Sequence, residues 1–237
     1  MCIKLAVIGN GKTGSRITRL LSSNAMQLNG ESPELEVFNT SRPIHLETLR
    51  HCDAAIVFVP GEGLKEMIPI LLESGIPVVC GTTGFEYSSE FQTRVSARGA
   101  YWVVASNFSP LMCALQKALE TLGQNPALEG SRAELKETHH VNKKDAPSGT
   151  ALRWKEWYGR DSQIESLREG DVVGEHTLTI STQFENLTIH HSALSRDLFA
   201  SGAIQAANHL LKLIESGTLK HGVYTFSELE EEMSCMN

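Results

Sequence analysis

The chain has 237 residues, of which 41% are hydrophobic and 21% charged, and its 21 basic against 28 acidic side chains give a net charge of −7. No run approaches the roughly 18 apolar residues that a membrane span requires, and the scattered basic residues do not form the footprint of a nucleic-acid binder. We therefore expect a cytoplasmic globular protein with no membrane or nucleic-acid partner, long enough for two domains. The five cysteines have neither close pairing nor metal-ligand spacing, so we expect reduced thiols and no metal site.

Short apolar runs alternate with helical patterns through the first hundred residues. The strand-like runs lie at 4–9, 35–40, 53–60, 77–84 and 101–108, and the helix-like segments at 15–22, 63–73 and 88–98. Continuous apolar strands separated by helices are typical of a parallel sheet covered on both faces. The pattern predicts an α/β, Rossmann-type doubly wound domain over residues 1–108.

A glycine-rich turn follows the first strand in the sequence VIGNGKTGSRI. The spacing of Gly9, Gly11 and Gly14 allows a tight turn, close approach of a pyrophosphate, and close packing of the following helix, whose amides face the phosphates. A turn that only connects two elements is the alternative. The residues that we expect to bind a dinucleotide here are Gly9, Asn10, Gly11, Lys12, Thr13 and Gly14.

Two further groups of residues follow predicted strands. The second strand is followed by Asn39, Thr40, Ser41 and Arg42 with no carboxylate, which favours NADPH over NADH, although Arg42 as a solvated loop charge is an equal alternative. The nicotinamide end of the cofactor is expected at the ends of later strands, where ordinary turn formation is the alternative. These residues are Gly81, Thr82, Thr83, Ser106, Asn107 and Phe108.

The pattern changes near Ser109. A helix is predicted at 110–123, a short helix begins at Ser148, and residues 174–194 alternate as two strands joined near Glu185-Asn186. A further helix at 196–217 ends at Gly217. We expect a second, open-faced α+β domain over residues 109–212, with 213–237 returning to the first domain.

The stretch ETHHVNKKDAPSGTAL at 137–152 gathers histidines, lysines and a turn into a helix. Strand alternation directs His139 and His140 to opposite faces, so one shared metal ion is not expected. The helix start around Ser148, Gly149 and Thr150 offers amides to an anion, and Lys143 adds a mobile ammonium. The set suits a carboxylate substrate with proton transfer nearby. A packed histidine, a solvated lysine and a ligand-free cap are the alternatives.

These motifs resemble the dihydrodipicolinate reductase family over nearly the whole chain, most specifically in HH…K.DAPSGTAL, but also in GNGKTG, CGTTGF, ASNFSP, GEHTLTIS, SALSRDLFASGAIQAA and HGVYTFSELE. The resemblance implies NAD(P)H-dependent reduction of 4-hydroxy-tetrahydrodipicolinate to tetrahydrodipicolinate with loss of water, in diaminopimelate and lysine biosynthesis. It also implies a mixed sheet in the substrate domain and a homotetramer assembled through that sheet.

The resemblance further implies residue roles. His139 would donate or accept a proton, and Lys143 would donate the proton that accompanies hydride transfer. His140, Gly149 and Thr150 would bind substrate, and Ala105 joins the cofactor residues. Many relatives have a histidine and a basic residue where this chain has Val141-Asn142, and the chain is short for the family.

Two other hypotheses remain open on the sequence. One is another amino-acid dehydrogenase of similar domain plan that acts on a different carboxylate. The other is a catalytically inactive sensor that binds NADPH and signals through its oligomer surface.

Overall fold

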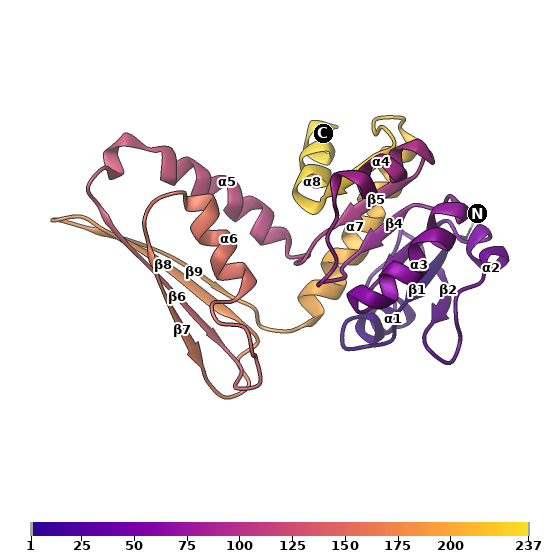
Figure 1. The fold of residues 1–237 in the computed structure, drawn as a ribbon, viewed down its shortest axis with the longest axis horizontal. Coiled ribbons are helices and arrows are strands. Elements are labelled where there is room, and N and C mark those ends of the chain that lie inside the picture. Colours follow the sequence, from indigo (N-terminus) through magenta and orange to yellow (C-terminus); the bar gives the residue numbers. More distant parts are fainter. Residues whose placement is uncertain (1, 237) are drawn as a thin grey trace. The chain divides into compact units, whose positions relative to one another are not determined.

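A computed structural model describes residues 2–236, which divide into two compact units (Figure 1). The first unit contains the residues up to Pro110 and those from Asp197 onward, and the second is Leu111–Arg196. Each unit has its own sheet. No helix among the residues that the structure describes is long and apolar enough to cross a membrane.

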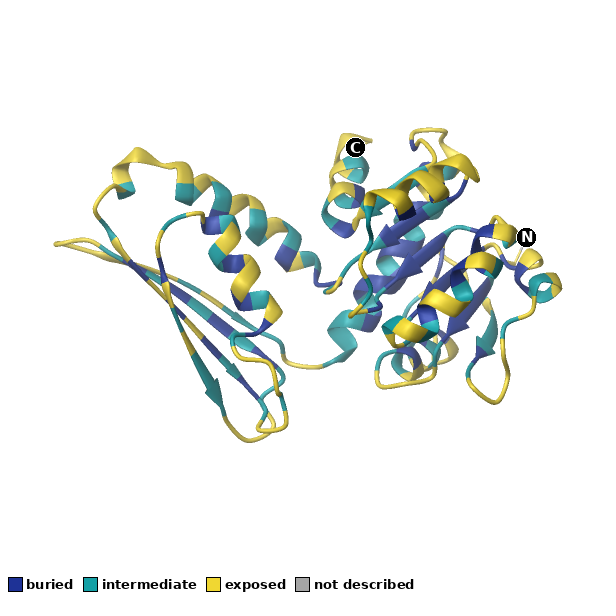
Figure 2. Ribbon diagram, viewed as in Figure 1, coloured by how far each residue is buried: buried dark blue, intermediate teal, exposed yellow. Residues whose placement is uncertain are grey.

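The first unit is built on a parallel sheet of six strands in the order β10-β5-β4-β3-β1-β2. The strands are β1 (Lys4–Ile8), β2 (Glu34–Phe38), β3 (Ala54–Val57), β4 (Val78–Cys80), β5 (Tyr101–Val104) and β10 (Gly222–Thr225). The central strands are buried on both faces (Figure 2), as their continuous apolar runs predict. The Rossmann-type fold class is confirmed.

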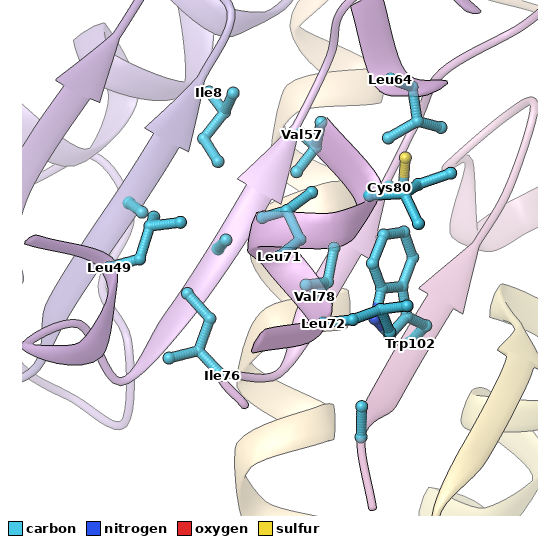
Figure 3. Packing of buried hydrophobic residues seen from close by; sticks show 14 of the residues in the cluster. Ile8, Leu49, Val57, Leu64, Leu71, Leu72, Ile76, Val78, Cys80 and Trp102 are labelled. Atoms are coloured by element: carbon cyan, nitrogen blue, oxygen red, sulfur yellow. The ribbon is translucent and has the colours of Figure 1, made fainter. Parts of the chain in front are cut away.

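Helices cover both faces of this sheet because each face carries apolar side chains. The helices are α1 (Gly14–Ser22), α2 (Leu46–Arg50), α3 (Gly61–Ser74), α4 (Ser89–Ala97), α7 (Asp197–Glu215) and α8 (Phe226–Cys235). Leu49 of α2 and Leu71 of α3 belong to one core cluster with strand residues that include Val57, Val78 and Trp102 (Figure 3). Helix α7 contacts α1, α8 and strands β3 and β4.

The boundary of the second unit differs from our expectation. We expected the chain to return to the first domain at residue 213, whereas α7 already belongs to the first unit from Asp197. The reason is burial: Ala203, Ile204, Ala207 and Leu210 of α7 are fully buried in the first unit, so its apolar face completes that core. Strand β10 then adds to the sheet beside β5.

The second unit is a mixed four-stranded sheet in the order β7-β6-β8-β9. Its strands are β6 (Arg132–His139), β7 (Gln163–Arg168), β8 (Glu175–Ser181) and β9 (Asn186–Ser192). Strands β6 and β7 are parallel, whereas β6 with β8 and β8 with β9 are antiparallel. The predicted hairpin at 174–194 is therefore confirmed, whereas the sequence did not reveal β7.

Helices α5 (Pro110–Gln124) and α6 (Gly149–Tyr158) cover one face of this sheet (Figure 1). A short 3-10 helix, Pro126–Leu128, precedes β6. Trp154 and Tyr158 of α6 and Leu119 of α5 pack on Leu135 and Leu178 of the strands. The opposite face carries alternating polar side chains, including Lys136, Thr138, Thr177, Thr179, Thr188 and His190, most of them partly or fully exposed. The open-faced mixed sheet is thus confirmed.

Candidate active site

The glycine turn connects β1 to α1 in a conformation that excludes larger residues at two of its positions. Gly9 has φ +101°, and a Cβ there would overlap the carbonyl oxygen of Phe58. A Cβ at Gly14 would overlap the carbonyl oxygen of Gly9, so these two glycines are required by packing. A Cβ at Gly11 would meet nothing within 4 Å, so the turn is open at that position.

This geometry fits a dinucleotide. Helix α1 begins at Gly14 with no acidic side chain in its first turn, and its N-cap Thr13 makes no side-chain cap. The Ser15 and Arg16 amides already donate to carbonyls of the turn. What remains for an anion is the positive dipole end of the helix, and Gly11 leaves room for the pyrophosphate to approach. Asn10 and Lys12 are exposed beside it.

The segments after β4 and β5 lie at the same edge of the sheet, since these parallel strands are neighbours. Gly81 lies so close to the Phe58 ring that a Cβ at this position would overlap it. Tyr87 Oη lies 3.3 Å from the carbonyl oxygen of Thr82 and fixes the loop. The predicted residues that this edge brings together are Gly81, Thr82, Thr83, Ala105, Ser106, Asn107 and Phe108.

Two of these predicted residues are less accessible than the sequence indicates. The ring of Phe108 is buried between Phe58 and Phe226, with ring centroids 5.9 and 5.3 Å away. Thr82 is only 3% exposed. Phe108 is a core residue: it is 1% exposed, and its carbonyl lies so close to Gly202 of α7 that a Cβ there would overlap it.

Arg42 lies in a tight turn after β2. The side chain of Asn39 accepts hydrogen bonds from the amides of Ser41 and Arg42, at 2.8 and 3.0 Å. The Arg42 guanidinium lies over the Phe38 ring, 5.4 Å from its centroid, and pairs with Glu36 at 2.5 Å. Lys4 and Arg42 lower the pKa of Glu36 by hydrogen bonding to its carboxylate. The guanidinium is held near the end of β2 while more than half of its surface stays exposed.

In the second unit, a buried group of polar side chains lies where β6 ends. His139, at 7% exposure, has its Nδ1 against Glu137 Oε2, and Glu137 is fully buried. Burial lowers the pKa of His139, against the opposing effect of Glu137. Gly174 makes room for the ring, because a Cβ there would lie 2.9 Å from His139 Nε2. His139 is therefore a neutral imidazole near neutral pH, oriented by a carboxylate.

Helix α6 starts beside this group. Some of the amides at its start are hydrogen-bonded within the protein, and others are not. The Ser148 hydroxyl is buried; it accepts from the Ala151 amide at 3.2 Å and lies 3.1 Å from His176 Nε2. The Ser148 amide donates to Glu137 Oε1 at 3.3 Å. No described residue accepts from the amides of Gly149 and Thr150, and a Cβ on Gly149 would meet nothing within 4 Å. These two amides therefore have no acceptor among the described residues.

Lys143 lies in the loop between β6 and α6. Its ammonium bonds both carboxylate oxygens of Asp145, at 2.7 and 2.8 Å, and this contact lowers the pKa of Asp145. The loop backbone is held separately by Arg168 of β7, whose guanidinium donates to the carbonyls of Lys143 and Asp145 and to Glu137 Oε1. The ammonium can therefore change partner without moving the loop.

The two adjacent histidines diverge, as strand alternation predicts. His139 is buried and His140 is partly exposed, and the His140 carbonyl accepts from the Lys143 amide at 3.0 Å. Glu137, His139 and His176 together offer ligand atoms within 4.8 Å of one another and could hold a metal ion. The Arg168 guanidinium already balances the Glu137 charge at 3.0 Å, which weakens the attraction of this group for a divalent cation.

Sequence reasoning missed Glu137, Arg168 and His176. Glu137 could have been found, since it precedes His139 by two residues on a strand and must share its face. Arg168 and His176 reach the group only through sheet register, in which Arg168 pairs with His139 and His176 with Glu137. The predicted helix start is one residue early, because Ser148 is the N-cap and α6 begins at Gly149.

A glycine turn that fits a dinucleotide in one unit, and a buried histidine beside a helix start with unpaired amides in the other, are features of a pyridine-nucleotide-dependent oxidoreductase. The chain belongs to the dihydrodipicolinate reductase family. Residues 3–108 match the family description "Dihydrodipicolinate reductase, N-terminus", and residues 111–229 match "Dihydrodipicolinate reductase, C-terminus".

Relatives support this assignment. The 4-hydroxy-tetrahydrodipicolinate reductase of Xanthomonas axonopodis pv. citri is 38% identical over 162 residues, 67% of each chain. That of Xylella fastidiosa is 32% identical over 222 residues, 88% of this chain and 92% of the relative. The dipicolinate-bound dihydrodipicolinate reductase from Paenisporosarcina sp. TG-14 shares the fold, with a TM-score of 0.72, 19% identity, and coverage of 96% of this chain and 99% of that one.

Proposed function

We propose that this enzyme reduces 4-hydroxy-tetrahydrodipicolinate to tetrahydrodipicolinate with loss of water, using NAD(P)H, in diaminopimelate and lysine biosynthesis. One observation carries the proposal for this site: the amides of Gly149 and Thr150 have no acceptor among the described residues, at a helix start beside the Lys143 loop. A helix start and an ammonium are suited to carboxylate groups. Family membership supplies the reaction.

The substrate carboxylates would bind to Lys143, to the Gly149 and Thr150 amides, and to the side chains of Thr150 and His140. In the absence of substrate Lys143 is bonded to Asp145, which is more than half exposed. A substrate carboxylate would replace Asp145 as the partner of the ammonium. Until then, the bond to Asp145 keeps the ammonium in place without burying it. Ser148 would contribute as the cap that starts the helix, because its hydroxyl is used within the protein.

Proton transfer would fall to His139 and Lys143. Reduced nicotinamide supplies the hydride when it is bound. Loss of water takes a proton from the carbon beside the hydroxyl and delivers one to the departing hydroxyl. Hydride addition then requires one proton for the neighbouring atom of the substrate. His139, whose Nδ1 faces Glu137, has Nε2 left to donate or accept a proton, and the Lys143 ammonium is the donor that accompanies hydride transfer.

NADPH is the cofactor that we propose this chain prefers. No carboxylate follows β2, where one would hold the ribose hydroxyl of NADH, and Arg42 is half exposed with Thr40 beside it. Its guanidinium could bind a 2′-phosphate while still stacked on Phe38. The remaining cofactor contacts would come from Gly9 to Gly14 and from the loops after β4 and β5.

A homotetramer assembled through the open face of the four-stranded sheet is the proposed assembly. That face has no helix over it within the described part of the chain, and its polar residues alternate along all four strands. We place the enzyme in the cytoplasm, consistent with five cysteines that form no disulfide among the described residues.

Turnover with both cofactors tests the proposed function. Purified protein should consume NADPH when freshly prepared 4-hydroxy-tetrahydrodipicolinate is added, faster than it consumes NADH, and tetrahydrodipicolinate should form in equal amount. Binding of NADPH without consumption would refute the reductase function and favour a sensor. Consumption with a different amino-acid substrate only would favour another dehydrogenase.

A further inference from the structure

Arg168 connects three parts of the second unit that are distant in sequence. Its side chain lies on β7, next to His139 in the sheet register. Nη1 donates to Glu137 Oε1 at 3.0 Å, Nε donates to the Lys143 carbonyl at 3.2 Å, and Nη2 donates to the Asp145 carbonyl. One planar group thus holds a buried carboxylate and two points of the Lys143 loop, a geometry that lysine cannot reproduce.

Glu137 extends this connection to the helix start and to the histidine. Oε1, which accepts from Arg168, also accepts from the Ser148 amide at 3.3 Å, and Oε2 faces His139 Nδ1. The carboxylate is fully buried, which raises its pKa, but the neighbouring Ser166 hydroxyl and the Arg168 guanidinium outweigh burial and hold that pKa below the usual range. It therefore stays ionised and keeps its partners in place.

We propose that Arg168 and Glu137 form a positioning pair for the reaction, which sets the Lys143 loop, the amide end of α6 and the His139 ring relative to one another. This inference rests on the proposed function. Neither residue is placed against substrate or cofactor: Glu137 is fully buried, and the guanidinium hydrogen bonds of Arg168 all go to protein oxygens. They act through the groups that they hold.

The chain provides a matched control for the arginine. Arg160 also donates to three carbonyls within the second unit, those of Gly123, Asn125 and Leu128, at 2.5, 2.7 and 3.2 Å. None of these belongs to the candidate site. Arg160→Lys and Arg168→Lys therefore make the same chemical change in similar hydrogen-bonding environments, but only Arg168→Lys loosens the Lys143 loop.

The experiment compares kcat, KM, NADPH affinity and thermal unfolding of the full-length wild type, Arg168→Lys, Arg160→Lys and Glu137→Gln. We expect Arg168→Lys and Glu137→Gln to lose about 100-fold in kcat/KM, because small displacements of reacting groups cost that much. Arg160→Lys should stay within a few-fold of wild type at a comparable loss of thermal stability. NADPH affinity should be unchanged in all three variants.

Chemical rescue separates positioning from folding. Guanidinium at millimolar concentration should restore part of the turnover of Arg168→Ala, and should restore none in Lys143→Ala. The inference is overturned if Arg168→Lys is as active as Arg160→Lys, if the loss of activity equals the loss of folded protein, or if guanidinium does not rescue. Wild-type turnover reports separately on the proposed function, and the affinity of each variant for dipicolinate tests positioning even without turnover.

Discussion

Replacing Lys143 by alanine should remove turnover while leaving the fold intact, and both effects can be estimated from the structure. Among the described residues, the Lys143 ammonium bonds only Asp145. The two side chains are 22% and 58% exposed, so their pairing contributes about 0–1 kcal/mol to stability. The loop backbone keeps its bonds to Arg168. The free energy of unfolding should therefore fall by less than about 1 kcal/mol.

The catalytic loss should be much larger. A hydrogen bond from an ammonium to a substrate carboxylate is worth about 1.5–3 kcal/mol. Loss of a positioned proton donor costs a further factor of about 10² to 10⁴ in rate. Together these predict a fall in kcat/KM of at least about 1,000-fold in Lys143→Ala, most of it in kcat.

The assay is steady-state NADPH oxidation with freshly prepared substrate, accompanied by denaturant unfolding and a NADPH titration. Lys144→Ala is the matched control, because the neighbouring lysine is exposed and the described contacts include no ion pair for it. Its kinetics should match wild type. Turnover of Lys143→Ala within about tenfold of wild type, at unchanged stability, would refute the role of this lysine in chemistry.

Three further predictions follow from the same geometry. Gly11→Ala should weaken NADPH binding by at least about tenfold, about 1.4 kcal/mol, without loss of stability, because the new methyl group enters only open space; Gly63→Ala in a helix is its control. Arg42→Ala should lower the ratio of NADPH to NADH specificity constants by about 10- to 100-fold if its guanidinium binds the 2′-phosphate, and an unchanged ratio would exclude that contact. Burial lowers the pKa of His176 to about 3, below its unfolded value, so its contribution to stability is complete above about pH 6.5 and is lost as pH falls toward 3. His176→Asn should flatten the pH dependence of the unfolding free energy over that window, whereas the exposed His190→Asn should not.

Local patterns in the sequence predicted the five strands β1 to β5 of the first unit, the glycine turn after β1 and the start of α6. The Gly9 to Gly14 turn, the Lys143 loop and the start of α6 each depend on neighbours within a few positions. Turn geometry, helix capping and strand alternation act over such distances. The fold class could be predicted for the same reason, since continuous apolar runs indicate which strands are buried.

The residues that hold the site together could not be found in this way. Arg168 and His176 join the group because β7 and β8 pair with β6 in one particular register. Register depends on contacts between strands that no single segment encodes. The return of the chain at Asp197 was missed for a related reason, since the apolar face of α7 does not indicate which sheet it will cover.

A crystal structure of the protein with NADPH and dipicolinate would test most directly that the Lys143 loop and the start of α6 form the substrate receptor. We predict carboxylate oxygens within hydrogen-bond distance of the Gly149 and Thr150 amides and of the Lys143 ammonium, which would have left Asp145. Dipicolinate bound elsewhere, or bound while the Lys143–Asp145 pair stays intact and both amides remain without an acceptor, would contradict the account.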